Sequence, residues 1–131
     1  MYILDTSAVI DVLRGRMEIK DKITSLTNVH DQLGVTYLTL CELYRGIYLA
    51  NRPEKDLAVL HEFMKCITGS FGFDAHVCEF YGQLYARNKK KGKTMQDLDL
   101  MIASIVMMNE AVLVTRDRGF KSIEGLRVEL W

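Results

Sequence analysis

The stretch Tyr2-Ile3-Leu4-Asp5-Thr6-Ser7 ends a short apolar run on a carboxylate. The run is typical of a buried strand, and a charge beside a hydrophobic core costs several kcal/mol unless something compensates it. Three more acids border apolar runs elsewhere in the chain: Glu42, Asp99 and Asp117. One such carboxylate can pair with an arginine, whereas four that converge require a metal ion.

Outward from this stretch, expected strands alternate with expected helices. Short apolar runs predict strands at residues 2–5, 34–38, 71–73, 111–115 and 127–130. Apolar residues at helical spacing predict helices at residues 7–14, 18–28, 54–66 and 75–88, with two others starting at Leu40 and near Asp97. Gly15 is expected to end the first helix. The alternation predicts an α/β sandwich with a mostly parallel sheet.

Two threonines are expected to mark helix starts. Thr39 precedes Leu40 and is a favourable N-cap residue. The segment Thr94-Met95-Gln96-Asp97 resembles a capping box ahead of a helix that ends near Asn109. These positions set the predicted starts of the helices that carry Glu42 and Asp99.

Parallel strands need crossover helices, which leave the carboxyl ends of the strands at one edge of the sheet. Asp5 and Asp117 lie at the ends of two expected strands, and Glu42 lies about one turn into the helix after a third. Ligands of such sheets bind in the crevice at that edge. The sequence therefore predicts that these acids share one site.

A site built from Asp and Glu suits a hard divalent cation such as Mg²⁺ or Mn²⁺. Zinc is disfavoured because His30, His61 and His76 form no ligand pair at metal-binding spacing. A cation held among carboxylates favours hydrolysis of phosphodiester bonds. Whether one ion or two bind stays open.

The composition indicates an ordinary globular protein, expected to form a single domain over residues 1–131. Apolar residues make up 49% of the chain and charged residues 26%, which suffices for a hydrophobic core. The net charge is zero and gives no indication of a nucleic-acid partner. No secretory signal or membrane-length apolar run is evident. Cys41, Cys66 and Cys78 are expected to be reduced and buried, as in a cytoplasmic protein.

Four segments, in this order, resemble those of the PIN-domain nucleases. They are Leu4-Asp5-Thr6-Ser7, Glu42-Leu43-Tyr44-Arg45-Gly46, Asp99-Leu100-Met101-Ile102-Ala103-Ser104, and Val112-Leu113-Val114-Thr115-Arg116-Asp117 with Phe120. The tail Gly125-Leu126-Arg127-Val128-Glu129 is similar to that of the small VapC-type toxins within the family. The resemblance spans essentially all 131 residues.

The resemblance implies a three-layer α/β/α sandwich around a roughly five-stranded sheet. It also implies a Mg²⁺- or Mn²⁺-dependent ribonuclease, usually the toxin of a toxin–antitoxin pair. Ser7 and Thr115 would be polar supports, and the acidic ligands would be Asp5, Glu42, Asp99 and Asp117. The implied partners are a second copy of the chain and a VapB-like antitoxin, whose tail would place a basic side chain in the acidic pocket.

Asp97 competes with Asp99 for the third acidic position. The spacing to Ile102 and Ala103 favours Asp99. Asp97 is either a helix-start acid, favoured by the helix dipole, or a fifth carboxylate beside the metal.

Several basic residues are candidate contacts for RNA or an antitoxin. The densest run contains Lys89, Lys90 and Lys91. This run either offsets the repulsion between RNA phosphates and an acidic site or is a solvated helix end. Arg45 and Arg116 lie near two of the acids in the sequence and either contact a partner or pair locally.

Two other functions remain open. A non-catalytic RNA-binding or scaffold module with this fold is the main alternative, although all four acidic positions are filled. A phosphohydrolase or receiver-like domain fits less well, because Ser7 stands where a second aspartate is needed. Arg116, and not the lysine of a receiver, follows Thr115.

Overall fold

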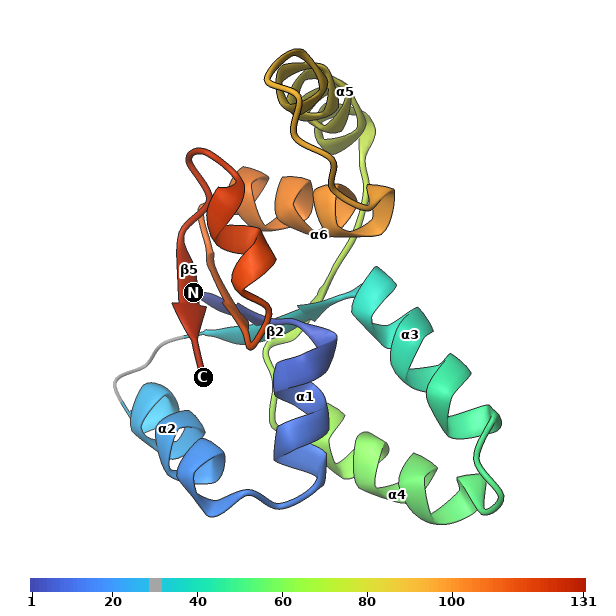
Figure 1. Cartoon of the computed structure of the whole chain (residues 1–131). Coiled ribbons are helices and arrows are strands. Elements are labelled where there is room, and N and C mark those ends of the chain that lie inside the picture. Colours follow the sequence, from blue (N-terminus) through green and yellow to red (C-terminus); the bar gives the residue numbers. More distant parts are fainter. Residues whose placement is uncertain (29–31) are drawn as a thin grey trace.

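A computed structural model describes residues 1–28 and 32–131, and in these residues five parallel strands form one sheet (Figure 1). The strand order is β3-β2-β1-β4-β5. The strands are β1 (Tyr2–Leu4), β2 (Leu33–Thr36), β3 (Gly69–Phe71), β4 (Val112–Thr115) and β5 (Val128–Leu130). The predicted α/β fold with a parallel sheet is therefore confirmed. The third strand lies two residues earlier than its predicted position.

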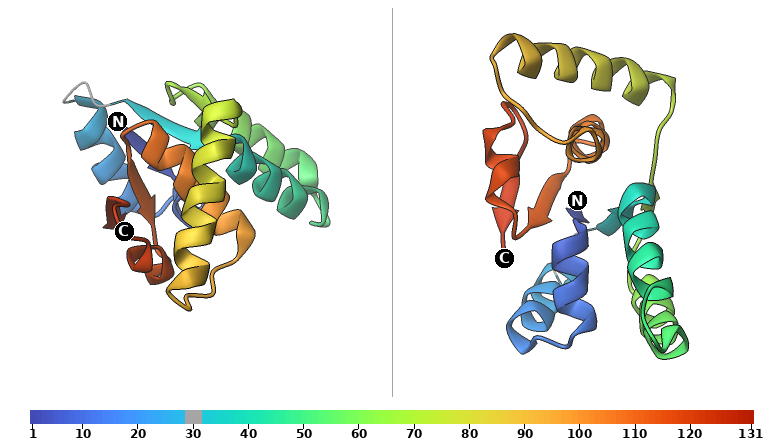
Figure 2. Two further views of the ribbon diagram at one scale, coloured as in Figure 1. Left: turned by 90° about the horizontal axis from the view of Figure 1, so that it is seen from above. Right: turned by 45° about the vertical axis from the view of Figure 1, so that its right-hand side comes forward.

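Helices cover both faces of the sheet (Figures 1 and 2). One layer contains α1 (Thr6–Leu13), α2 (Met17–Asn28), α3 (Tyr37–Tyr48) and α4 (Pro53–Met64). The other contains α5 (Ala75–Lys90) and α6 (Asp97–Met108). A short 3₁₀ helix, η1 (Arg118–Ser122), follows β4 and has no counterpart among the predicted elements. The result is a three-layer α/β/α sandwich.

The central strands are buried on both faces, and their alternating side chains divide between two hydrophobic cores. Ile3 and Leu113 pack with α5 and α6. The next residues along the same strands, Leu4 and Val114, pack with α1, α3 and α4. This two-residue alternation follows from strand geometry and explains why short, continuous apolar runs form the middle of the sheet.

The strand register aligns the carboxyl ends of the three central strands. Leu4 pairs with Val35 of β2 and with Val114 of β4. The residues that follow these three, Asp5, Thr36 and Thr115, therefore emerge at the same edge. This edge carries the candidate site.

Two predicted helix caps are wrong, although α6 begins at Asp97 as expected. Thr36, and not Thr39, caps α3, because its hydroxyl accepts the backbone N–H of Thr39 at 2.9 Å. At α6, Gln96 is the N-cap residue and makes no side-chain capping bond, so Thr94 does not cap the helix. The predicted end of α1 is correct, since Gly15 adopts φ 73° just beyond it.

The expected burial of the cysteines is also wrong. Cys41, Cys66 and Cys78 are free, but all three are exposed. Cys41 lies off the face of α3 that buries Leu43 and Ile47, so the helix turns it toward solvent.

Two further sequence features concern histidines and membrane helices. His61 and His76 are exposed, whereas His30 lies outside the described residues. Across residues 1–28 and 32–131, no helix combines the length and hydrophobicity needed to cross a membrane.

Candidate active site

Four different segments bring acidic residues to the carboxyl edge of the sheet. Asp5 follows β1 directly, and Asp117 lies two residues beyond β4. Glu42 is in the second turn of α3, the helix that leaves β2, and Asp99 is in the first turn of α6. The four residues span most of the sequence, so only the assembled sheet places them at one edge.

Asp5 is the most buried of the four acids, with 7% of its surface exposed. Its Oδ2 accepts hydrogen bonds from Thr115 Oγ1 at 2.8 Å and from Ser7 Oγ at 3.2 Å. The other oxygen, Oδ1, has no hydrogen-bond partner among the described residues. Ser7 and Thr115 therefore orient the carboxylate and leave one oxygen available to a ligand.

Glu42 is held in a similar way by α1. Its Oε2 accepts a 2.5 Å hydrogen bond from Thr6 Oγ1. Arg45 lies on the same face of α3, with its Nη2 4.0 Å from Glu42 Oε1, but the arginine side chain is largely exposed. The neutralisation that Arg45 provides is consequently weak.

Asp117 immediately precedes η1 and caps it. Its Oδ1 accepts the backbone N–H of Gly119 at 2.7 Å, and its own N–H donates to Thr115 Oγ1 at 3.0 Å. Thr115 thus contacts both Asp5 and the Asp117 backbone. The hydroxyl of Thr115 ties the ends of β1 and β4 together at the site.

The surroundings of Asp99 indicate that the four acidic side chains lie within electrostatic reach of one another. Burial raises the pKa of the Asp99 carboxyl above its ordinary value, and three neighbouring carboxylates raise it further, in the order Asp117, Asp5, Glu42. Every charged group that shifts this pKa is an acid. A site with uncompensated negative charge of this kind favours a bound cation.

The donor set fits a hard divalent cation. It consists of four carboxylates without histidine or cysteine, which matches the oxygen preference of Mg²⁺ and Mn²⁺. Within the described part of the chain, no three acidic, histidine or cysteine side chains already stand at the spacing of one ion's ligands. The carboxylates therefore lie within electrostatic reach of one another but are more open than a closed coordination sphere.

Asp97 lies on a different side of α6 from Asp99. It contributes to the raised pKa of the Tyr81 phenol, after burial, and Tyr81 belongs to α5. It also lines a small cavity with Tyr85 and Lys89 of α5. Asp97 is not among the charges that act on Asp99.

The lysine run occupies the end of α5 and is exposed. Lys91 pairs with Glu124, and Lys93 donates to the carbonyl of Ser122 at 2.7 Å. These contacts attach this end of α5 to the end of η1 and to the segment that follows it. Lys89 and Lys90 make no ion pair among the described residues.

Arg116 pairs with a residue that the sequence analysis did not single out. Its Nε lies 3.0 Å from Oδ2 of Asp11, a buried acid on α1. Thr6, the partner of Glu42, was missed as well. The available signals were the position of Thr6 beside Asp5 and the i,i+4 spacing of Ser7 and Asp11 on one helix.

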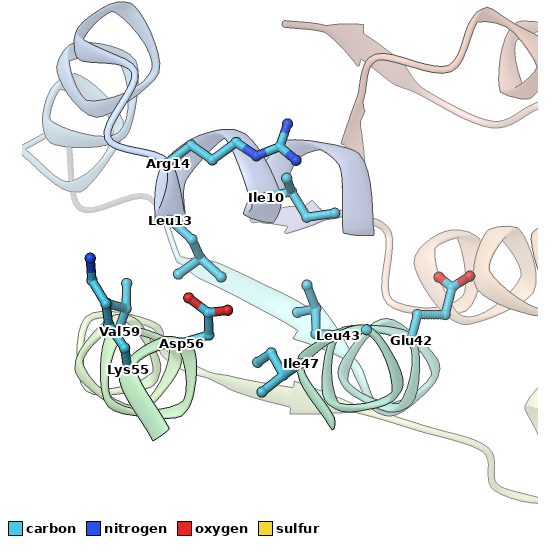
Figure 3. Close-up of a pocket in the computed structure, with 10 residues that line it drawn as sticks. Ile10, Leu13, Arg14, Glu42, Leu43, Ile47, Lys55, Asp56 and Val59 are labelled. Carbon is cyan, nitrogen blue, oxygen red and sulfur yellow. The ribbon is translucent and has the colours of Figure 1, made fainter. Parts of the chain in front are cut away.

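A groove runs between α1 and the α3–α4 pair, with a volume of about 450 Å³ (Figure 3). Its apolar lining consists of Ile10, Leu13, Leu43, Ile47 and Val59. Polar groups at its margin include Arg14, Lys55 and Asp56. Of the four site acids, only Glu42 lines the groove, so the groove adjoins the acidic site without containing it.

Solved structures of similar shape include toxin–antitoxin complexes. VapBC2 from Rickettsia felis, bound to a DNA fragment of its promoter, aligns with a TM-score of 0.92 at 25% identity, covering 99% of this chain and 98% of that chain. DNA-bound VapBC from Salmonella typhimurium aligns with a TM-score of 0.88 at 28% identity, covering 99% and 97%.

Sequence comparison points in the same direction. Ribonuclease VapC2 from Haemophilus influenzae is 30% identical over 132 residues, covering 99% of this chain and 97% of that protein. The tRNA(fMet)-specific endonuclease VapC from Salmonella typhimurium is 29% identical over 132 residues, with the same coverage. Residues 2–126 match the PIN domain family. The chain therefore belongs to the PIN domain family.

Proposed function

We propose that this protein is a Mg²⁺- or Mn²⁺-dependent endoribonuclease and the toxin of a VapBC-type pair. The observation that carries the proposal is the convergence of four acids from separate segments at the carboxyl edge of the sheet, where burial and the charges of the other three raise the pKa of Asp99. The names of the related ribonucleases support RNA as the substrate. The similar structures of VapBC complexes support an antitoxin as the partner.

The proposed ligand set is Asp5, Glu42, Asp99 and Asp117. Hydrogen bonds from neighbouring groups restrain three of these carboxylates: Thr115 and Ser7 hold Asp5, Thr6 holds Glu42, and the Gly119 amide holds Asp117. Such restraint reduces the cost of arranging ligands around an ion. When bound, the cation would activate water and neutralise charge on a phosphoryl oxygen.

Asp97 is proposed to stay outside the ligand set. Its charge acts on Tyr81 and not on Asp99, so it faces α5 rather than the acidic cluster. Its position at the first residue of α6 is sufficiently explained by the favourable interaction of an acid with a helix N-terminus.

Basic residues around the acids are proposed to bind the RNA backbone. Arg45 is exposed beside Glu42. Arg116 follows the same edge beside Asp117, but its guanidinium pairs with Asp11, so it is a weaker candidate for phosphate contact. Lys89 and Lys90 are exposed and unpaired among the described residues, so they are better candidates for phosphate contact than Lys91, which pairs with Glu124. These positive charges would offset the repulsion between RNA and the site.

The groove beside α1 is the proposed docking site of a VapB-like antitoxin. Its apolar lining suits the apolar face of an amphipathic segment. Because Glu42 lies at its margin, a segment bound there would reach the acidic site with a basic side chain. The proposed assembly also includes a second copy of the chain, as the family resemblance implies.

Cleavage of RNA by the purified, antitoxin-free protein tests the function. We expect cutting with Mg²⁺ or Mn²⁺, none with EDTA, and none with the Asp5→Asn variant. Far-ultraviolet circular dichroism would verify that the variant is folded. Tight RNA binding without metal-dependent cutting would contradict the proposal and favour the non-catalytic RNA-binding module.

A further inference from the structure

Asp11 is a buried carboxylate outside the proposed ligand set. It lies on α1, and only 1% of its side chain is exposed. Two arginines from different parts of the chain contact this carboxylate. Arg116 Nε lies 3.0 Å from Oδ2, and Arg16 Nε lies 3.3 Å from Oδ1. The Arg16 contact lacks hydrogen-bond geometry, since Oδ1 has no hydrogen-bond partner. The Arg116 contact is the shorter of these two ion pairs.

Arg116 is attached to α1 at two points. Its backbone N–H donates to Ser7 Oγ at 3.0 Å, and its side chain pairs with Asp11. Ser7 and Asp11 are four residues apart, so they lie one turn apart on the same face of the helix. The segment that leaves β4 is thereby fixed along one face of α1.

Arg116 also stands between two residues of the acidic site. Thr115, before it, donates to Asp5, and Asp117, after it, donates its backbone N–H to Thr115 Oγ1. A shift of Arg116 along α1 would move Asp117 relative to Asp5. We propose that Asp11 is a positioning residue that acts through Arg116 to hold the turn bearing Asp117 in register with Asp5.

The charge of Asp11 matters to this role. A buried ion pair usually contributes little net stability, because desolvation offsets the attraction between its members. What such a pair provides is a specific contact between two charges, and here the contact joins α1 to a turn whose other anchors are single hydrogen bonds. The guanidinium of Arg116 has no second side-chain partner among the described residues, so removal of the Asp11 charge would release it.

Amide hydrogen exchange measured by NMR tests the positioning directly and needs no metal. The Asp11→Asn variant is expected to raise exchange about tenfold at the amides of Arg116, Asp117 and Gly119, because the ion pair that anchors this turn to α1 is lost. The Leu113 amide, which bonds Arg127 in the sheet, should exchange as in the wild type. Unchanged exchange at the three turn amides would overturn the proposal. A uniform increase that includes Leu113 would overturn it too, because Asp11 would then be a general stabilising residue.

Two arginine variants serve as the partner test and its control. Arg116→Gln removes the same contact from the more exposed side of the pair and should reproduce the local increase in exchange, even if Asp11→Asn fails to fold. Arg16→Gln removes the other arginine from the same carboxylate and should leave the turn amides at wild-type rates. Equal effects of the two arginine variants would contradict the proposed route through Arg116.

A second readout, which rests on the proposed function, is Mn²⁺ affinity measured by electron paramagnetic resonance. Asp11→Asn should weaken binding about tenfold in the wild type and in an Asp99→Asn background, and should have no further effect in an Asp117→Asn background. An equal loss in all three backgrounds would show that Asp11 does not act through Asp117. Absence of Mn²⁺ binding by the wild type would instead refute the metal site, while the exchange experiment still decides the role of Asp11.

Discussion

Asp99 and Asp97 show how two acids on one helix acquire different surroundings. A step of two residues rotates the side chain by about 200° around the helix axis, so the two carboxylates leave α6 on nearly opposite sides. Asp99 turns toward Asp5, Glu42 and Asp117, whereas Asp97 turns toward Tyr81 on α5. The sequence spacing favoured Asp99 as the site acid, and the surroundings of the two carboxylates support that choice.

The raised pKa of Asp99 has a consequence for stability. A carboxyl whose folded pKa exceeds its unfolded value favours folding most at pH values below the unfolded pKa. That advantage is lost as the pH rises through the folded pKa. Without metal, Asp99→Asn should therefore raise the unfolding temperature at pH 7, and the gain over wild type should vanish at pH 3. Thermal unfolding of both proteins in EDTA at pH 7 and at pH 3 measures this difference in unfolding temperature. A variant less stable than the wild type at pH 7 would contradict the electrostatic account.

Cleavage kinetics should separate the two acids. Asp99→Asn is expected to lower kcat/KM at least about 100-fold. Mutation of a residue that only hydrogen-bonds a metal ligand can already lower activity by up to about that factor. Asp97→Asn should lower kcat/KM less than about threefold, within the range of a remote surface change. Equal losses from both variants would show that Asp97 belongs to the site.

At the scale of elements, the sequence predicts where most strands and helices lie but not how the helices begin. The apolar runs that form β1, β2 and β4 are visible in the sequence because strands in the middle of a parallel sheet are buried on both faces. Residues Tyr37 and Leu38 continue the apolar run of β2, yet the chain turns into α3 at Thr36. That turn depends on where pairing with β1 and β3 ends, which is a tertiary property.

The misplaced caps make a paired test. Thr36→Ala should lower the free energy of unfolding by about 1 kcal/mol, because a buried hydroxyl that accepts the Thr39 N–H is lost. Thr94→Ala should change it by less than about 0.5 kcal/mol, because Thr94 is exposed and caps no helix. Urea unfolding of both variants provides the measurement. A larger effect at Thr94 than at Thr36 would restore the capping pattern expected from the sequence.

For the whole molecule, the order of the four acidic segments indicated the family, but the contacts between them required the structure. Asp11 was inconspicuous because its partner Arg116 lies far along the chain and meets it only after the sheet forms. The cysteines were misjudged for a related reason, since burial depends on which helix face meets the core. Local pattern predicts elements and their order, whereas side-chain surroundings depend on assembly.

The groove between α1 and the α3–α4 pair gives a prediction at the same scale. Val59→Glu places a charge in the apolar lining of the groove. For a VapB-type antitoxin that inhibits the wild type, this change should weaken inhibition by about tenfold or more. RNA cleavage without antitoxin should persist. Met108→Glu is the matched control, because Val59 and Met108 are 37% and 42% exposed and Met108 lies outside the groove. Equal inhibition of both variants would place the antitoxin elsewhere.

The central claim is that four separate carboxylates form one cation site, and Mn²⁺ titration of the apo protein tests it most directly. The wild type should bind Mn²⁺, and affinity should fall at least about tenfold in each of four folded variants: Asp5→Asn, Glu42→Gln, Asp99→Asn and Asp117→Asn. Asp97→Asn should bind as the wild type does. Absence of binding by the wild type, or wild-type affinity in the four variants, would contradict the account.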